Sequence, residues 1–120
     1  MTKDHLVYIE DILDSIAKIN AYTKDMSFSE FKNDSKTQDA VVRNFEIIGE
    51  AARQIPPDIK KKNPKVPWKA MIGMRNKMIH EYAGVVLEVV WKTLKEDLPG
   101  LEKQLKEIFR RYNKSPKLFK

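Results

Sequence analysis

The chain has 120 residues, of which 42% are hydrophobic and 33% charged, an ordinary composition for one globular domain with a wet surface. It contains no cysteine, which excludes disulfide scaffolds, cysteine-ligated zinc and thiol catalysis. No apolar run approaches the roughly 18 residues that a membrane helix needs, and the acidic N-terminus lacks a signal-peptide pattern. We therefore expect a soluble cytoplasmic protein with no membrane partner.

The formal net charge of +6 is distributed unevenly along the chain. Residues 55–80 hold seven basic side chains and one acidic side chain, and residues 106–120 hold six and one. Clustered lysine and arginine attract nucleic-acid phosphates, but the same clusters also serve as a solvated surface that keeps a protein in solution. Charge alone favours the second interpretation.

The N-terminal part of the chain shows the period of an amphipathic helix. Over residues 4–22, apolar side chains recur every three or four positions, and Asp4 suits the N-cap of a helix. The stretch that follows is polar and broken, with Ser27 and Ser29 as candidate caps, and it leaves room for a short helix over residues 29–32. We expect one long and one short helix here.

A second long helix is expected over residues 36–55, where apolar residues again follow helical spacing. Gly49 costs about 1 kcal/mol relative to alanine inside such a helix, so we expect the close approach of another backbone as its compensation. Pro56 and Pro57 end the helix, and residues 58–66 then form a basic connector.

The C-terminal half is expected to hold further helical segments. Pro67 suits the first turn of a third helix, which ends near His80–Ala83. Helical spacing resumes over residues 85–98, Pro99-Gly100 marks a kink or a break, and the apolar stripe then continues to Tyr112. The stripe before the proline consists of Val86, Val90, Leu94 and Leu98.

No segment of the sequence alternates with the period of two that a half-buried strand requires. We therefore predict an all-α fold, most simply four or five antiparallel helices, in a single domain over residues 1–112. Residues 113–120 form a basic C-terminal tail that we expect to be frayed.

One stretch breaks the pattern of its own helix. Between Trp68 and Tyr82 the apolar positions line up on one face, and Arg75 falls among them. A buried charge without a partner is very costly, so Arg75 must reach water or a carboxylate, for which Glu46 and Glu50 are the candidates. The arginine is then either a structural ion-pair partner or a functional residue.

The residues around this arginine can support phosphodiester chemistry. His80 can act as base or acid near neutral pH, the planar fork of Arg75 suits phosphate oxygens, and Asn76 can orient a neighbour or donate to an oxyanion. Together they match metal-independent cleavage of RNA, whose own 2′-hydroxyl is the nucleophile. The lysines that could gather the RNA backbone are Lys60, Lys61, Lys62, Lys65, Lys69 and Lys77.

On a straight helix Arg75 and His80 do not converge, because five positions separate their directions by about 140°. Asn76 and His80 are four positions apart and share a face. Three arrangements would unite the set: the helix unwinds near His80, the long arginine reaches around, or two copies of the protein pool their residues. The third arrangement would make the site a property of a dimer.

Each of these residues also has a structural interpretation. A histidine at a helix end commonly serves as a cap or a surface group, and Tyr82 equally suits a core position. His5 and His80 are the only histidines, and no pair of residues has metal-ligand spacing. We therefore expect neither a metal nor a cofactor.

The series Arg-Asn-x-x-x-His-x-Tyr at residues 75–82 resembles the motif of the HEPN superfamily. The segment Thr37–Ala51 and the pair Pro67-Trp68 extend the likeness, more narrowly to the HepT-like toxins, over residues 4–112. The resemblance implies a four-to-five-helix up-and-down bundle that dimerises and gathers its motifs in a cleft between the two copies.

The same resemblance implies a metal-independent endoribonuclease toxin, in which Arg75 and His80 are the catalytic pair and Asn76 supports them. Its partner would be a minimal nucleotidyltransferase antitoxin of the MntA type, which neutralises the toxin by AMP transfer to Tyr82. The added bulk and negative charge would repel RNA. Two alternatives stay open: a non-catalytic HEPN binding module that assists a nucleotidyltransferase in nucleotide or substrate recognition, and a plain interaction bundle without a site.

Overall fold

Helices make up most of the described part of the chain, which comprises residues 3–80 and 86–113 of this computed structural model, without the side chains of Lys3, Asp4, Ile79 and His80. No strand occurs in these ranges, and none of their helices is long and apolar enough to cross a membrane. The elements in chain order are α1 (Lys3–Thr23), α2 (Phe28–Lys32), α3 (Ser35–Gln54), α4 (Pro57–Lys62), α5 (Trp68–His80), α6 (Leu87–Lys92), the π-helical turn η2 (Thr93–Asp97) and α7 (Leu98–Tyr112).

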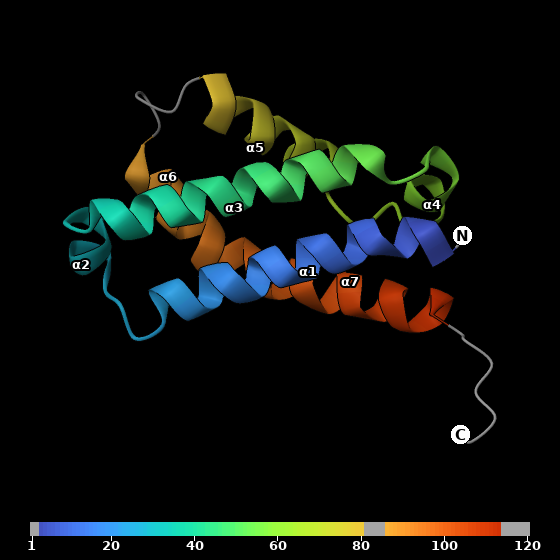
Figure 1. Cartoon of the computed structure of the whole chain (residues 1–120), viewed down its shortest axis with the longest axis horizontal. Helices are drawn as coiled ribbons and strands as arrows, with labels where there is room; N and C mark the ends of the chain where they lie inside the picture. The colour runs from blue at the N-terminus through green and yellow to red at the C-terminus, as the bar shows by residue number, and fades with distance from the viewer. Residues whose placement is uncertain (1–2, 81–85, 114–120) are drawn as a thin grey trace.

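The four long helices run in alternating directions along the length of the molecule (Figure 1). Helix α1 packs lengthwise against α3, α3 packs against α5, and α7 covers α1 from another side. This arrangement confirms the predicted all-α, up-and-down bundle. Helix α3 contacts both α1 and α5, so residues on its two sides can link these helices.

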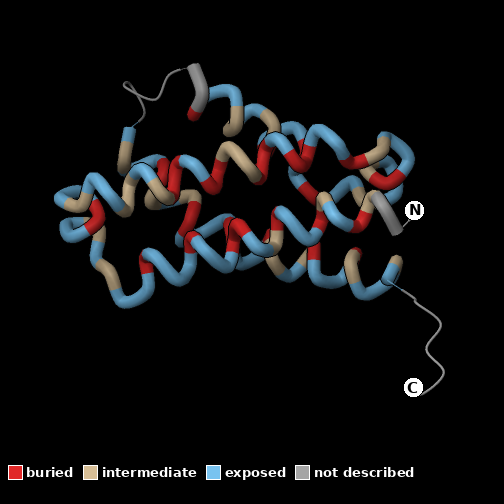
Figure 2. Tube along the Cα trace, viewed as in Figure 1, coloured by how far each residue is buried: buried red, intermediate tan, exposed pale blue. Residues whose placement is uncertain are grey.

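The core lies where the predicted apolar stripes face each other between the long helices (Figure 2). All of the predicted stripe of α3 is buried, and α1 buries its stripe except Leu13, which is half-buried. Each fully buried isoleucine contributes roughly 2 kcal/mol relative to an exposed one. The buried stripe residues of α1, of α3 and of its C-cap position are Leu6, Ile9, Ile12, Ile16, Ile19, Val41, Phe45, Ile48, Ala52 and Ile55.

The prediction of a connector without helix over residues 58–66 is wrong for the first half of this segment. These residues belong to helix α4. Pro57 occupies the first turn, where its missing N–H is not needed, and Asp58 there complements the helix dipole. Ile59 is fully buried, and the backbone N–H of Asn63 closes the helix by donating to the carbonyls of Ile59 and Lys60. Helix α3 ends at Gln54 because Pro56 keeps the preceding residue, Ile55, in an extended conformation with φ −67° and ψ 130°.

The interruption predicted at Pro99-Gly100 takes the form of a wide turn just before the proline. The backbone N–H of Leu98 donates to the carbonyl of Thr93, five residues back, and Pro99 falls in the first turn of α7. Val90 and Leu94 are buried as predicted. Val86 is 56% exposed, because it precedes α6 as its N-cap residue and does not share the buried face of the helix.

Local hydrogen bonds define the ends of the short helix α2 and the start of α3. Ser27 Oγ accepts from the Glu30 N–H, and the Glu30 carboxylate accepts from the Ser27 N–H, which forms a capping box. Asp34 caps α3 by accepting from the Thr37 N–H and hydroxyl, and these bonds lower the pKa of the Asp34 carboxyl. Of the two candidate caps predicted from the sequence, Ser27 is the N-cap of α2, whereas Ser29 lies inside the helix.

Candidate active site on helix α5

Helix α5 carries the motif and is anchored at its start and middle by large side chains. Trp68 and Met71 are buried, and the Trp68 ring N–H donates to the carbonyl of Asn63 at 3.0 Å. Met78 is buried as well. These anchors fix the rotation of α5 and so determine which way the intervening residues face.

At Gly49 the backbones of α3 and α5 come into direct contact. A Cβ added to Gly49 would clash with the Cβ of Arg75, and it would lie 2.8 Å from the carbonyl oxygen of Met71. The close approach predicted from this glycine is confirmed, and the backbone it meets is that of Arg75. The presence of glycine at position 49 therefore allows α5 to bring Arg75 against α3.

The Arg75 side chain is held between α3 and its own helix. Its Nε lies 2.9 Å from a carboxylate oxygen of Glu50, but the N–H does not point at an acceptor, so the contact is an ion pair without hydrogen-bond geometry. Its Nη1 donates to the side-chain oxygen of Asn76 at 2.8 Å. The Glu50 alternative predicted for Arg75 is confirmed, whereas Glu46 pairs with Arg43 at 3.3 Å.

The other motif residues divide between described and undescribed parts of the chain. Asn76 is exposed and contacts Arg75. His80 is the last residue of α5, but its side chain lies outside the described residues, as does Tyr82 entirely. The structure therefore brings together Arg75, Asn76 and Glu50.

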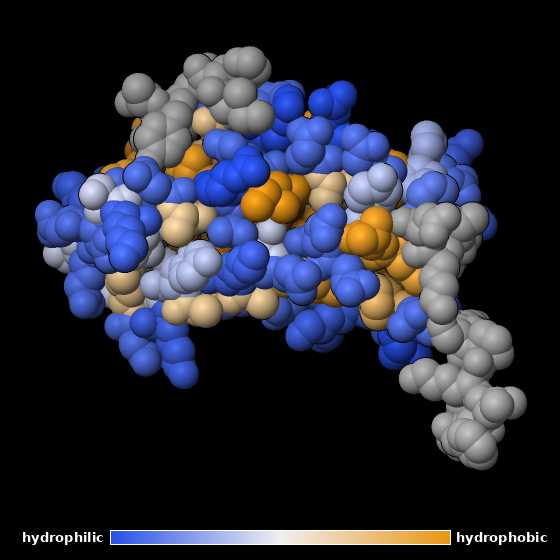
Figure 3. Space-filling model, in the orientation of Figure 1, coloured by the Kyte–Doolittle hydropathy of each residue, from blue (hydrophilic) through white to orange (hydrophobic). Residues whose placement is uncertain are grey.

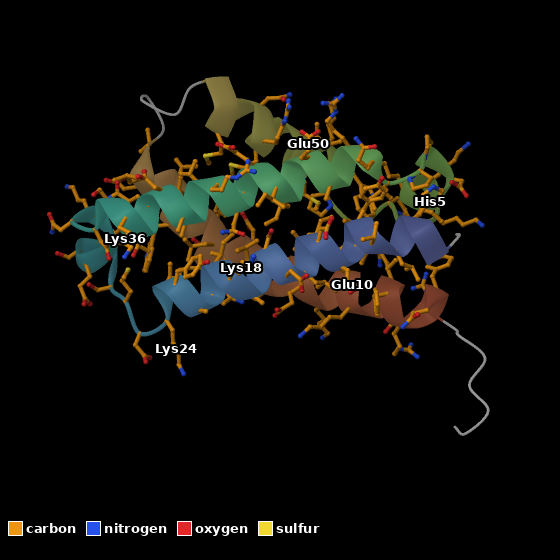
Figure 4. The ribbon with its side chains drawn as sticks, in the orientation of Figure 1. His5, Glu10, Lys18, Lys24, Lys36 and Glu50 are labelled. Atoms are coloured by element: carbon orange, nitrogen blue, oxygen red, sulfur yellow. The ribbon has the colours of Figure 1, made fainter. Side chains whose placement is uncertain are left out.

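A shallow groove of about 400 Å³ runs beside Arg75 along α1 and α3. In Figure 4 the labelled Glu50 lies on the side of α3 that faces α5. The charged residues of the groove are two arginines and three carboxylates, so its charge is mixed rather than strongly positive. They are Arg43, Arg75, Asp11, Glu46 and Glu50.

The lysines predicted to bind RNA spread along and beyond α5. Lys77 lies next to Asn76, whereas Lys69 is six residues before Arg75, or about 9 Å along the helix. The remaining four belong to α4 and the loop after it, and Figure 1 shows α4 at the end of the bundle away from the end of α5. All are exposed except the half-buried Lys60; the four are Lys60, Lys61, Lys62 and Lys65.

Comparison with known families decides which class of protein this is. The family model for HepT-like ribonucleases matches residues 12–108. The chain belongs to the HepT-like ribonuclease family. The resemblance predicted from the motif is thereby confirmed at the level of the family.

Several relatives match this HepT-like chain over nearly its whole length. A Thermococcus cleftensis protein named "Probable ribonuclease HepT" is 45% identical over 108 residues, which cover 90% of this chain and 98% of the relative. A Methanocaldococcus jannaschii protein with RNase in its name is 42% identical, with 90% and 89% coverage. A Caldanaerobacter subterraneus protein, also named as an RNase, is 43% identical, with 87% and 93% coverage. No solved structure matches the chain.

A second cavity of this HepT-like chain, larger than the motif groove, lies away from that groove. It measures about 670 Å³ and is bounded by α3, α5, η2 and α7. Its walls are mainly apolar, including Phe45, Met71, Met74 and Leu101, with Glu96 and Asp97 also lining it. None of the motif residues Arg75, Asn76 or Lys77 lines it.

The contribution of α1 to the groove was not anticipated from the sequence. Tyr8 and Asp11 on α1 line it together with Arg75. They lie on the polar flank of the α1 stripe, and nothing in the local spacing relates them to a residue more than sixty positions later. Only the pairing of α1 with α3, and of α3 with α5, brings them to the same surface.

The surface of this family member is predominantly hydrophilic on the face in Figure 3, with separate apolar patches.

Within the described residues, no group of histidine, aspartate and glutamate side chains could hold a metal ion. The charged groups gathered at the motif are thus the arginine, the carboxylate that it contacts and the neighbouring lysine, which suits binding of a phosphate by direct hydrogen bonds.

Proposed function

We propose that this HepT-like chain is a metal-independent endoribonuclease in which Arg75 and His80 are the catalytic pair and Asn76 supports them. The observation that carries the proposal is the half-buried guanidinium of Arg75, which Glu50 and Asn76 hold on the helix that ends at His80. The RNase names of the relatives support the same substrate class. A guanidinium that is held in one orientation loses little conformational freedom when it binds phosphate oxygens.

In the proposed reaction the 2′-oxygen of a ribose attacks the adjacent phosphorus. Its proton passes to a base, the bond between phosphorus and the 5′-oxygen breaks, and that oxygen takes up a proton. The products are a 2′,3′-cyclic phosphate and a 5′-hydroxyl. His80 serves in proton transfer, and Arg75 stabilises the additional negative charge on the phosphoryl oxygens in the transition state.

We further propose that two copies form the cleft. Arg75 faces Glu50 on α3. Five positions on a straight helix separate two directions by about 140°, so such a helix does not aim the residues at positions 75 and 80 at one phosphate. Gly73 is consistent with the close approach of another molecule to α5. It is exposed in the middle of the helix, and a Cβ there would meet nothing within 4 Å. Nothing within the described chain requires a glycine there, whereas a second copy or RNA approaching α5 would.

RNA would then lie along α5, with Lys69 and Lys77 contacting its phosphates first. Helix α5 is about 20 Å long, enough for only a few nucleotides. The lysines of α4 and its following loop would contact the backbone beyond the start of α5. These are Lys60, Lys61, Lys62 and Lys65.

The cleavage chemistry is tested by the products and by a chelator. The full chain is incubated with a labelled RNA in excess EDTA, and the new ends are identified. We expect undiminished cleavage, with 2′,3′-cyclic phosphate and 5′-hydroxyl ends, because no step uses a metal-activated water. Cleavage that EDTA abolishes, or that leaves 5′-phosphate ends, would contradict the mechanism; an inert wild type would contradict the activity itself.

We propose that the protein acts as the toxin of a toxin–antitoxin pair and that an MntA-like nucleotidyltransferase silences it by AMP transfer to Tyr82. Tyr82 follows His80 by two residues, so an adenylate there would place bulk and negative charge beside the cleft. The charge would repel the phosphates of RNA from Arg75.

For this modification we expect a mass gain of one adenylate, with pyrophosphate released from ATP, when the chain, ATP and the cognate nucleotidyltransferase are combined, with RNA cleavage lost in parallel. Tyr82→Phe should prevent both the mass gain and the loss of activity. Tyr22→Phe is the matched control, since Tyr22 is 43% exposed on α1 and lies outside the groove. A mass gain that persists in Tyr82→Phe but not in Tyr22→Phe would transfer the role to another residue.

One observation favours a second function. Arg75 already contacts a carboxylate, and three carboxylates line its groove, which suits a binding module better than an anionic substrate channel. In that case the chain assists a nucleotidyltransferase in recognising a nucleotide or another substrate. An RNase-inactive wild type that lowers the KM of the nucleotidyltransferase for its substrate would support this function.

A further inference from the structure

We infer that Glu50 is a positioning residue for RNA cleavage, which acts by holding the Arg75 guanidinium in the orientation that receives the phosphate. The inference rests on the proposed ribonuclease function. It concerns a residue of α3 that lies outside the Arg-x4-His series and is connected to it through space.

The contact between the two side chains is set by the backbones. Gly49, the neighbour of Glu50, meets the Cβ of Arg75 directly, so the separation of α3 and α5 is fixed at this level. From there the Glu50 carboxylate reaches Arg75 Nε at 2.9 Å. The arginine side chain is 22% exposed and the glutamate side chain 51%, so the pair lies at the surface with the arginine beneath.

Two attachments restrict a group that is otherwise free to rotate. Glu50 lies beside Nε, and Asn76 accepts from Nη1, so the plane of the guanidinium is defined by residues on two helices. Neither of these two contacts involves Nη2, so the N–H donors of Nη2 can bind a ligand. A long arginine that is already held loses less conformational freedom when it binds a phosphate, and its donors meet the same oxygens in every turnover.

The negative charge of Glu50 also has an effect that opposes RNA binding. The experiment must separate this effect from the positioning of Arg75. A carboxylate this close to the guanidinium partly cancels its field, which weakens the long-range attraction of RNA. A positioning role predicts that removing the carboxylate lowers kcat. A purely competing role predicts that KM falls while kcat stays constant.

The groove offers a matched control in Glu46, one helical turn before Glu50. It lines the same groove, but its carboxylate contacts Arg43 instead of Arg75. Glu46→Gln therefore removes the same charge from the same surface and leaves the attachments of Arg75 intact.

The experiment measures kcat and KM for RNA cleavage by the full chain carrying Glu50→Gln, Glu50→Ala or Glu46→Gln. We expect both Glu50 variants to lower kcat about tenfold or more with little change in KM, and Glu46→Gln to change kcat less than about twofold. In an Arg75→Ala background, Glu50→Gln should cause no further loss. An unchanged kcat in Glu50→Gln, or an equal loss in both backgrounds, would overturn the inference.

A second readout does not depend on catalysis. Nuclear magnetic resonance of the Arg75 Nε–H group should show a resolved signal in the wild type that broadens or moves in Glu50→Gln and stays in place in Glu46→Gln. If the wild type fails to cleave RNA, the proposed function is wrong, and this signal still tests whether Glu50 positions Arg75. An identical signal in the wild type and Glu50→Gln would overturn the positioning role.

Discussion

Gly49→Ala is expected to destabilise the protein by about 2–3 kcal/mol and to displace Arg75. The new methyl group would clash with the Arg75 Cβ and lie 2.8 Å from the Met71 carbonyl oxygen and 3.0 Å from the Arg75 Cα. These are backbone or backbone-adjacent atoms, so no flexible side-chain end can move aside. Helix α5 must then withdraw from α3, which separates Glu50 from the guanidinium and should lower RNA cleavage as well as stability.

Two other glycines provide the matched comparison for this variant. A Cβ at Gly73 on α5 or at Gly100 on α7 would meet nothing within 4 Å, so alanine there should stabilise the monomer by up to about 1 kcal/mol. Urea unfolding of the three alanine variants measures the differences. If Gly49→Ala unfolds at the same urea concentration as Gly100→Ala, α3 and α5 are not in backbone contact at this level.

Arg75→Ala and His80→Ala are each expected to lower kcat/KM for RNA cleavage by about 10²- to 10⁴-fold. Arginine removal takes away charge stabilisation of the transition state, and histidine removal takes away a proton-transfer group. Stability should change little for Arg75→Ala, because its ion pair with Glu50 is half exposed and such pairs contribute about 0–1 kcal/mol. The control is Arg53→Ala, which removes an exposed arginine from the last turn of α3.

Mixing the two inactive variants tests whether the site is shared between copies. If Arg75 of one copy works with His80 of the other, a mixed dimer has one intact site. Random pairing makes half of the dimers mixed, so about a quarter of wild-type activity should return. We expect this recovery because five positions on a straight helix separate two directions by about 140°. No recovery would show that each site takes both residues from a single copy.

The helices that could be predicted from the sequence were those with a long uninterrupted period. The bounds of α1 and α3 agree with expectation to within about two residues, the usual uncertainty of helix ends. Helix α4 was missed because its six residues are too short to show a period, and only its caps and the buried Ile59 reveal it. The interruption predicted at Pro99-Gly100 is present, but its form as the wide turn η2 could not be read from the sequence, because an apolar pattern does not show which carbonyl each N–H contacts.

The site was predictable where its signals are local. The misplaced arginine, the asparagine beside it and the glycine that requires a close neighbour are all readable in the sequence, and the structure joins Gly49 to Arg75. The choice of Glu50 over Glu46 was not readable, since the two differ by one helical turn and only the level of the contact between α3 and α5 decides. Tyr8 and Asp11 required the tertiary packing.

The turn η2 has a consequence for chain length. Because the Leu98 N–H reaches back five residues instead of four, the segment Thr93–Asp97 has the geometry of an α-helix with one residue inserted. Deleting one residue here would restore the ordinary ladder and keep the buried faces of α6 and α7 aligned. A deletion in the middle of α7 would instead turn those faces apart by about 100°. Natural relatives should therefore vary in length by one residue at this point of the C-terminal half and keep the same core.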